Sequence, residues 1–417
     1  RISLAIFLIK ECLIQFVHIY NSTLTSQKKR VPLTPETSLS LRLLSGYSYA
    51  SWYCRSKPMT FWAHLRGMNK GERYEPSEEL AQAYSDHAPA MSLIPYYSRA
   101  FRYVSRSFEI RENLQNVWGQ GQSLHFKGIV HYGKSEYGKC IDDCRKAIKI
   151  LERTGDYWQV HIARYQVAAA QFRLGNFEEA NEECRKNYES GITLGDHQAS
   201  GIILDIWVQS SQGQLPKDLL EKEFARPRED VQGQAQVELA EAIILLKNGQ
   251  TELAIEYLVQ TKNKLEDAGV QNTYTCPIYT WLISAYRQLA EEDNSIFRSK
   301  RTDAIRCVKK LKQKALFLTR RFSNELPRLY RELAIISAME GNQNRAKKYL
   351  DKSLVIAHRA QAKHEIASSV LVMEKIGSEF RWGQAIPEIE SAKNYLTKIE
   401  AAKTINTVRD SISLANQ

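Results

Sequence analysis

Apolar residues return at helical spacing through most of the chain, and the clearest stretch, residues 114–196, repeats itself after 40 residues. Three features share this offset: Trp118 returns as Trp158, Cys144 as Cys184, and Gly155-Asp156 as Gly195-Asp196. Each copy holds an apolar stripe, a turn and a second stripe, which predicts a hairpin of two amphipathic helices. Because one face of such a hairpin stays apolar, we expect the hairpins to stack on one another.

The second helix of the first copy shows the stripe most clearly, because its apolar residues follow the helical period of about 3.6 residues. They are Tyr137, Cys140, Ile141, Cys144, Ala147, Ile148 and Leu151. The first helix of the next copy repeats the pattern with Ile162, Tyr165, Ala169 and Phe172. Burial of each large apolar side chain contributes about 1.5–3 kcal/mol, so stacking is expected to hold the array together.

Glycine or proline marks most of the expected turns, since a helix commonly ends in the left-handed conformation that Gly adopts at little cost. The turn centres are expected near Pro58, Pro95, Gly133, Gly175, Gly213, Gly249, Glu292, Gly341 and Gly383. Their spacing indicates a unit of about 40 residues. Ala254 and Ala346 each follow a turn glycine by five residues and let two helices approach closely. Residues 215–234 and 289–301 break the rhythm and are interpreted as insertions, which usually fall in loops.

Three regions are expected: an N-terminal apolar helix and linker at 1–36, aromatic-rich helical hairpins at 37–116, and the repeat array at 117–417. Residues 2–20 are strongly apolar, but Lys10-Glu11 interrupts them, and neither half approaches the roughly 20 residues needed to span a membrane. We therefore predict a buried helix there and no membrane contact. The chain begins with Arg1 rather than Met, which suggests a fragment of a longer product.

The composition fits this picture. A chain of 417 residues exceeds the size at which a single core stops growing, roughly 250–300 residues, so an array is favoured over one globule. Hydrophobic residues make up 43% and charged residues 25%, which indicates a folded, soluble chain. The seven cysteines are dispersed and odd in number, which favours a reducing cytoplasm over a disulfide framework.

Several strings resemble known repeat proteins. The turns GNFEEA and GNQNRA, each followed by a helix, resemble tetratricopeptide repeats. Between about residues 40 and 400, WAHLRGMNKGERYEPSEELAQAYSDHAPAM, WGQGQSLHFKGIVHYG, LERTGDYWQVHIARYQVAA and LGDHQASGI look like the repeat arm of large bacterial signalling proteins. In that family the arm lies between a serine/threonine-kinase and signal-transduction ATPase part and a sensor histidine-kinase part. The resemblance implies an all-α, right-handed α-solenoid of tetratricopeptide-like hairpins.

None of the strings that suggest chemistry assembles a reaction centre. GKSEYGKC, residues 133–140, nearly matches the phosphate-binding loop, but helix patterns surround it and Cys140 replaces the metal-binding hydroxyl. Cys140 and Cys144 lie one turn apart with His131 near in sequence, yet their counterparts 40 residues on, Ala180, Cys184 and Gln171, do not form a second ligand set, so small packing residues are the favoured interpretation. Gly119-Gln120-Gly121 lacks the third glycine of a dinucleotide fingerprint. We expect no catalytic residue, no cofactor and no metal site.

A partner groove is the first candidate for function. The repeat register places Asp205 where Tyr165 belongs, on a packed face, and a buried carboxylate needs a partner. Either a structural ion pair with a Lys or Arg or a polar contact to a bound peptide satisfies this need. In tetratricopeptide-like arrays the first helices line the concave side. The predicted groove residues are His131, His161, Arg164, Gln171 and Asp205.

A basic cluster is the second candidate. The chain carries a formal net charge of +11, and residues 298–321 hold ten Lys or Arg against Asp303 alone. The charges of the predicted basic patch, Arg306, Lys309, Lys310, Lys312 and Lys314, lie on an expected helix with Ile305, Val308, Leu311 and Leu318 beneath. Such a patch is either a solvated face, a contact for an acidic protein or a contact for nucleic-acid phosphates.

Together these patterns favour a non-catalytic, cytoplasmic scaffold for protein interaction and signal coupling. Its expected partners are a protein segment or flanking signalling domains. A basic helical-repeat protein that binds nucleic acid through residues 298–321 is the alternative.

Overall fold

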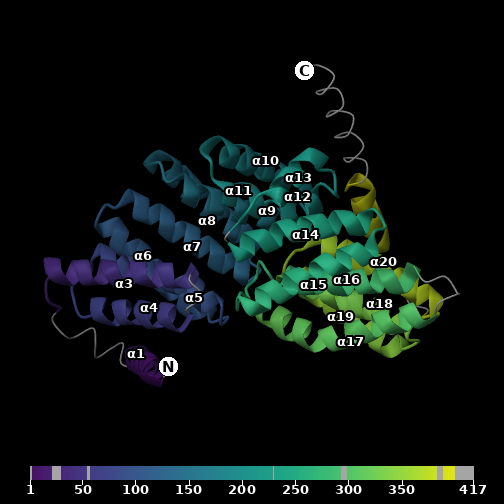
Figure 1. Cartoon of the computed structure of the whole chain (residues 1–417), viewed down its shortest axis with the longest axis horizontal. Helices are drawn as coiled ribbons and strands as arrows, with labels where there is room; N and C mark the ends of the chain where they lie inside the picture. The colour runs from purple at the N-terminus through teal and green to yellow at the C-terminus, as the bar shows by residue number, and fades with distance from the viewer. Residues whose placement is uncertain are drawn as a thin grey trace, which may run out of the picture. The chain divides into compact units, whose positions relative to one another are not determined.

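The computed structural model describes residues 2–20, 30–53, 57–228, 230–292, 298–382 and 388–399. Within these ranges the chain is almost entirely helical, and the only β pairing is an isolated bridge between Val31 and Tyr74. Helices alternate with short turns, and consecutive helices pack as antiparallel hairpins (Figure 1). The predicted all-α fold of stacked helical hairpins is confirmed.

The chain forms two compact units. Unit 1 comprises Arg1–His131 and Asp142–Ala163, and unit 2 comprises Tyr132–Ile141 and Arg164–Gln417. The divisions expected near residues 36 and 116 stay predictions.

The described helices up to Leu174 are α1 (Ile2–Tyr20), α3 (Pro35–Tyr53), α4 (Lys57–Gly71), α5 (Glu78–Ser92), α6 (Tyr97–Asn113), α7 (Val117–Gly133), α8 (Tyr137–Thr154) and α9 (Tyr157–Leu174). The later helices are α10 (Phe177–Leu194), α11 (His197–Ile202), α12 (Leu204–Ser210), α13 (Lys217–Ala225), α14 (Val231–Lys247), α15 (Thr251–Asp267), α16 (Pro277–Glu292), α17 (Arg298–Arg321), α18 (Leu326–Met339), α19 (Gln343–Arg359) and α20 (Lys363–Glu379). A short 3-10 turn, η1 (Ser323–Glu325), precedes α18.

Helices end at a regular interval because a residue with positive φ recurs every 20 positions. It is found at Gln115, Ser135, Gly155, Gly175 and Gly195. The next amide N–H then bonds back across the last helical turn, as from Asp156 to the carbonyl of Leu151 (3.2 Å). A 40-residue unit is therefore two equal helix-and-turn steps.

The second helix of each hairpin buries the same positions. Three, seven and ten residues after the start of α6, α8, α10, α15 and α19, the side chains are at most 1% exposed. The first of these positions is always Ala or Cys: Ala100, Cys140, Ala180, Ala254 and Ala346. The small side chains let neighbouring helices approach closely. The predicted stripe of α8 and the roles of Ala254 and Ala346 are confirmed.

The third of these positions, ten residues after the start of the helix, forms the same contacts in α6 of unit 1 and in α19 of unit 2. In unit 1, Ser107 Oγ donates to the carbonyl of Ala81 (2.7 Å) and lies 3.0 Å from Ser123 Oγ. In unit 2, Ser353 Oγ donates to the carbonyl of Pro327 (2.6 Å) and lies 2.9 Å from Ser369 Oγ. The sequence separations are identical, 26 and 16 residues. The two regions therefore share one repeat register.

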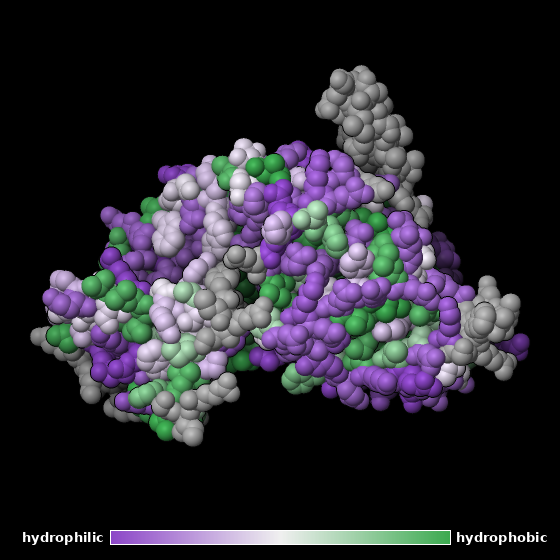
Figure 2. Space-filling view, in the orientation of Figure 1, coloured by the Kyte–Doolittle hydropathy of each residue, from purple (hydrophilic) through white to green (hydrophobic). Residues whose placement is uncertain are grey.

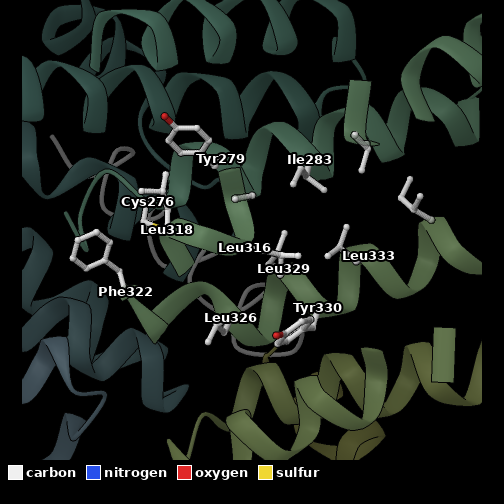
Figure 3. Packing of buried hydrophobic residues seen from close by; sticks show 13 residues of the cluster. Cys276, Tyr279, Ile283, Leu316, Leu318, Phe322, Leu326, Leu329, Tyr330 and Leu333 are labelled. Carbon is white, nitrogen blue, oxygen red and sulfur yellow. The ribbon is translucent and has the colours of Figure 1, made fainter. Parts of the chain in front are cut away.

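The apolar core shown in close-up lies in unit 2 between α16, α17 and α18 (Figure 3). Side chains from all three helices meet there, among them Tyr279, Ile283, Leu316, Leu318, Leu326, Leu329 and Leu333. On the surface of unit 2, hydrophilic residues form bands with hydrophobic residues between them (Figure 2). This alternation is typical of helices that bury one stripe and expose the other.

Two expectations need correction. Residues 2–20 do form a helix, but it is not buried, since Ile6, Leu13 and other large apolar side chains are more than half exposed. Pro58 lies in the first turn of α4, which begins at Lys57, a place that suits proline, and the turn expected near Pro58 falls at residues 54–56, outside the described ranges. Residues 215–234 are not a plain loop, since α13 lies within them and Glu223 is fully buried. Glu292 is the last residue of α16, and residues 293–297, where the turn is expected, lie outside the described ranges. Gly383 also lies outside them.

Of the helices in the described ranges, none combines the length and the apolar character that crossing a membrane requires.

Gly175 and Gly155 allow a matched test of what the turn glycines contribute to stability, through their backbone conformation and through the space beside them. Both have positive φ, 80° and 77°, but a Cβ on Gly155 would meet open space, whereas one on Gly175 would overlap the Tyr395 hydroxyl. We expect Gly155→Ala to lower the free energy of unfolding by about 1–2 kcal/mol through backbone strain alone. Gly175→Ala should cost roughly 1–3 kcal/mol more, because Tyr395 must move.

Urea denaturation of both variants measures the difference. Hydrogen exchange should also rise around Tyr395 in Gly175→Ala and stay unchanged there in Gly155→Ala. Equal losses in the two variants would show that the contact with Tyr395 contributes nothing.

Candidate ligand-binding cluster in unit 2

The predicted groove residues occupy different surroundings. His131 and His161 lie in unit 1, and both are buried. The His131 ring packs on Phe101, with ring centroids 4.5 Å apart, and its Nε2 lies 3.5 Å from Asp143 Oδ2. These contacts give His131 a structural role, and its place in a partner groove stays a prediction.

The other three groove residues lie in unit 2. Arg164 Nε is 3.7 Å from Glu183 Oε2, and Gln171 Oε1 accepts a hydrogen bond from Asn176 Nδ2 (2.7 Å) at the turn after α9. Asp205 is buried on α12, where it adjoins a cluster of tyrosine and glutamine side chains.

Three tyrosines form the centre of this cluster. Tyr274 lies in the segment before α16, and its ring stacks on Tyr132 with centroids 5.8 Å apart. Tyr165 of α9 also packs on Tyr274, with a distance of 5.6 Å between the ring centroids. The Asn272 side chain fixes the segment, because its Oδ1 accepts from the amides of Tyr274 (2.9 Å) and Thr275 (3.1 Å). A loop outside the repeat thus places an aromatic ring among the buried faces of the hairpins.

Two buried glutamines flank the tyrosines, and each uses only half of its amide. Gln166 Nε2 donates to the Tyr274 hydroxyl (2.8 Å), and Gln236 Nε2 donates to the Tyr165 hydroxyl (2.7 Å). The Oε1 atom of each has no hydrogen-bond partner among the described residues. Exchanging the oxygen and nitrogen of either amide would leave an N–H group unpaired instead, so each side chain retains unused hydrogen-bonding capacity in either orientation. We name the three tyrosines, the two glutamines and Asp205 the tyrosine–glutamine cluster: Tyr132, Tyr165, Tyr274, Gln166, Gln236 and Asp205.

Asp205 adjoins Gln236, whose Nε2 lies 3.4 Å from Asp205 Oδ1. Burial raises the pKa of the Asp205 carboxyl from 3.8 to about 7, because the charged form loses its hydration. In the part of the chain that the structure describes, no Lys or Arg forms an ion pair with it, so the ion pair weighed from the sequence is not found. A neutral or half-ionised carboxyl therefore lies beside the glutamine near neutral pH.

A buried ion pair extends the cluster. The guanidinium of Arg173 pairs with Glu325, and its Nη1 donates to the carbonyl of Asn324 (3.2 Å). Asn324 Nδ2 in turn donates to the carbonyl of Tyr132 (3.0 Å) and lies 3.3 Å from the Tyr137 hydroxyl. Arg173 Nε and Glu325 Oε2 are buried without a hydrogen-bond partner among the described residues. An unsatisfied buried polar group costs about 1–3 kcal/mol, so four of them in one region need an explanation.

Most of these residues were not predicted from the sequence. Asp205 was singled out because the repeat register showed a polar residue at a packed position. Gln166 follows Tyr165 on the same helix. Nothing in the sequence indicates that Gln236, which lies 71 residues after Tyr165, donates a hydrogen bond to the Tyr165 hydroxyl. Tyr274 and Glu325 lie between hairpins, where the repeat pattern carries no information.

The proposed basic patch lies on α17. Its apolar side is buried as predicted, with Val308 and Leu318 at 1% and 2% exposure. On the outer side, Arg306 pairs with Asp303, and Lys309 Nζ lies 2.6 Å from Glu340 Oε1. The remaining members are Lys312, whose Nζ lies 5.3 Å from the Tyr349 ring centroid, and the exposed Lys310 and Lys314. Neighbouring acids offset part of the positive charge, and nucleic-acid binding stays a prediction.

The stretch that resembles a phosphate-binding loop has a different structure. Residues 117–154, all described, form two helices joined by a turn, whereas the phosphate loop follows a buried strand. Cys140 is fully buried, and its Sγ lies 4.0 Å from the carbonyl oxygen of Gln166. Gly119 and Gly121 lie where helices approach closely, since a Cβ at either would meet Arg111 or Leu151. These glycines serve packing.

The pKa of Asp205 gives a stability prediction. In the unfolded chain its carboxyl ionises near pH 3.8, and in the folded chain it ionises near pH 7, so its contribution to stability falls as pH rises through this window. Asp205→Asn removes this titration. We expect the variant to gain stability relative to the natural chain between pH 5 and pH 8, by about 2–3 kcal/mol.

Urea denaturation at the two pH values measures this gain. Gln260→Ala, an exposed position on α15, is the control and should show no pH-dependent difference. A constant effect of Asp205→Asn at both pH values would contradict the raised pKa.

Comparisons with known proteins address the fold. No family model matches the chain, and no curated protein matches it. Among solved structures, the chain is similar to a Rap protein in complex with Competence and Sporulation Factor, with 12% sequence identity and a TM-score of 0.58. The match covers 89% of this chain and 98% of the Rap chain.

A monomeric IFIT1 mutant solved with m7Gppp-AAAA also matches, with 13% identity over 88% of this chain and 83% of that chain, and a TM-score of 0.40. The conclusion on the fold rests on the Rap match and on the hairpins described above. The chain has an all-α, tetratricopeptide-like helical-repeat fold.

Proposed function

We propose that this chain is a non-enzymatic interaction module in which the tyrosine–glutamine cluster of unit 2 binds an extended polypeptide segment, and that binding is coupled to flanking signalling domains. The observation that carries the proposal is the pair of half-used glutamine amides. The Rap protein of similar fold was solved with Competence and Sporulation Factor bound, which supports a binding role for this architecture.

The chemistry of the cluster suits a peptide backbone. An extended segment presents one N–H donor and one C=O acceptor per residue, and these groups need partners when they leave water. The free Oε1 atoms of Gln166 and Gln236 are acceptors for two such N–H groups. The rings of Tyr165 and Tyr274 lie next to these glutamines, and the partly exposed Tyr274 offers apolar surface for the side chains of the segment.

The neighbouring charged groups add selectivity. Arg173 Nε is a donor and Glu325 Oε2 an acceptor, and both are buried and unpaired among the described residues. A ligand that offers a complementary polar group here relieves a cost already present in the free protein. A ligand with an apolar group at the same place leaves both atoms unpaired and binds more weakly.

Signal coupling has a structural basis close to the cluster. Two residues beyond Arg173, the carbonyl of Gly175 accepts a hydrogen bond from the Tyr395 hydroxyl (2.9 Å). Phe177 packs on His364 nearby, with centroids 5.1 Å apart. These contacts join α9 and α10 to the C-terminal part of unit 2. A ligand that shifts α9 therefore changes the position of the last helices, which supports coupling to a flanking domain attached through them.

A peptide-display selection against the immobilised full chain tests the proposal. We expect wild type to enrich a family of sequences, and synthetic peptides of that family to bind at least tenfold more weakly to Gln166→Ala/Gln236→Ala, because both backbone acceptors are lost. Isothermal titration calorimetry measures the difference. Circular dichroism and thermal unfolding establish that the double variant is folded.

Gln260→Ala is the matched control, since Gln260 is an exposed glutamine of the same unit and should leave binding unchanged. Failure of wild type to enrich any sequence, or peptides that bind the double variant as tightly as wild type, would rule out the cluster as the binding site.

A further inference from the structure

Helix α1 of unit 1 exposes its apolar side chains and buries its polar ones. Six large apolar residues are 50% to 61% exposed: Ile6, Phe7, Ile9, Leu13, Phe16 and Val17. Glu11 and Gln15 are only 2% and 5% exposed. Hydrophobic residues gather on the surface where α1 lies (Figure 2). A surface helix normally has the opposite arrangement, so this face calls for a partner.

A buried polar network fixes the orientation of α1 on α4. Asn69 Nδ2 donates to Glu11 Oε2 (2.7 Å), and Arg66 Nη1 donates to Glu11 Oε1 (3.0 Å). Gln15 Nε2 donates to Glu72 Oε2 (3.1 Å), and Gln15 also bonds Asn69. Rotating α1 to hide its apolar residues would leave these buried groups without partners, at about 1–3 kcal/mol for each group. The apolar face is therefore held outward.

The outward face has the spacing of a helix-pairing seam. Ile6, Ile9, Leu13 and Phe16 are separated by three, four and three residues, the alternation that keeps apolar side chains on one line between two paired helices. At 100° per residue, the four lie within an arc of about 80°. Small residues, Ala5 and Cys12, border the seam on one side and allow a second helix to approach.

We propose that two copies of this chain pair through α1, seam against seam. The face is self-complementary because it is apolar along its length, as an isologous interface requires. The seam residues and Val17 each expose about 100 Å² of side chain, roughly 500 Å² per copy. Pairing that covers all of this surface buries about 1,000 Å² in total, which is the lower bound for a specific interface. None of these residues belongs to the tyrosine–glutamine cluster, so this pairing is independent of the proposed function.

A lipid surface fits the same face less well. Helices that lie on membranes carry Lys and Arg along their polar side, where anionic headgroups attract them. In α1 the polar side carries Glu11, Gln15 and His18, all directed at unit 1, and Lys10 is the only exposed charged residue among those described. The narrow seam also matches one partner helix better than a lipid layer.

Sedimentation equilibrium of the full chain over a range of concentrations tests the pairing. We expect a reversible monomer–dimer equilibrium for wild type and at least a tenfold weaker association for Leu13→Glu, because the variant places a charge in the seam. Leu13 is 60% exposed, so the substitution should not affect folding, and thermal unfolding checks this. Val355→Glu is the matched control, because Val355 is an apolar residue on α19 with 50% exposure, and it should dimerise like wild type.

Cys12 provides a second measurement, because it is exposed at the border of the seam. A bismaleimide should link two wild-type chains, and the linked dimer should be lost in Cys12→Ser and reduced in Leu13→Glu. A monomer at every concentration, or a dimer unaffected by Leu13→Glu, overturns the proposal. Sedimentation of monomeric wild type, but not Leu13→Glu, with phosphatidylcholine–phosphatidylglycerol vesicles would assign the face to lipid and also overturn it.

Discussion

The close approach of neighbouring helices is the constraint on which the rest of the structure depends. It is possible because the second helix of each hairpin keeps Ala or Cys three residues from its start. Seven positions later each of these helices has another buried side chain, none larger than Asn or Thr: Ser107, Ala147, Asn187, Thr261 and Ser353. Packing at this density leaves no room for an added methyl group without movement. Stability therefore comes from many contacts between hairpins, each small, and no helix of the array is stable alone.

The fold could be predicted because its determinants are local and periodic. A 40-residue offset that matches Cys144 with Cys184 places both at fully buried positions, and Gly155 and Gly195 both adopt the left-handed conformation that ends a helix. The orientation of α1 could not be predicted in this way. Hydropathy identifies an apolar helix, but which face it buries depends on Asn69 and Arg66, which lie more than 50 residues away. The same limit applies to the cluster in unit 2, where the repeat marked Asp205 but not its neighbour Gln236.

The interior of unit 2 combines two opposing tendencies. Its apolar clusters stabilise the fold, whereas the tyrosine–glutamine cluster retains polar atoms that have no hydrogen-bond partner among the described residues. Replacing such groups by apolar side chains of similar size is often neutral or stabilising in proteins. Similar unpartnered atoms, such as Asn187 Oδ1 and Trp281 Nε1, lie elsewhere in unit 2, so polar groups that cost stability are spread through its described interior.

The hydrogen bond from Tyr395 to the carbonyl of Gly175 spans 220 residues of sequence. During synthesis the hairpin of α9 and α10 emerges long before the segment that holds Tyr395, so the edge that Tyr395 contacts stays exposed to solvent until that segment has been made. A linear stack folds progressively from its first hairpin, but a stack whose early and late members touch gains its last contacts only by closing a long loop. Unit 2 therefore gains part of its cooperativity only when this distant segment joins the earlier hairpins, in addition to the contacts between neighbouring hairpins.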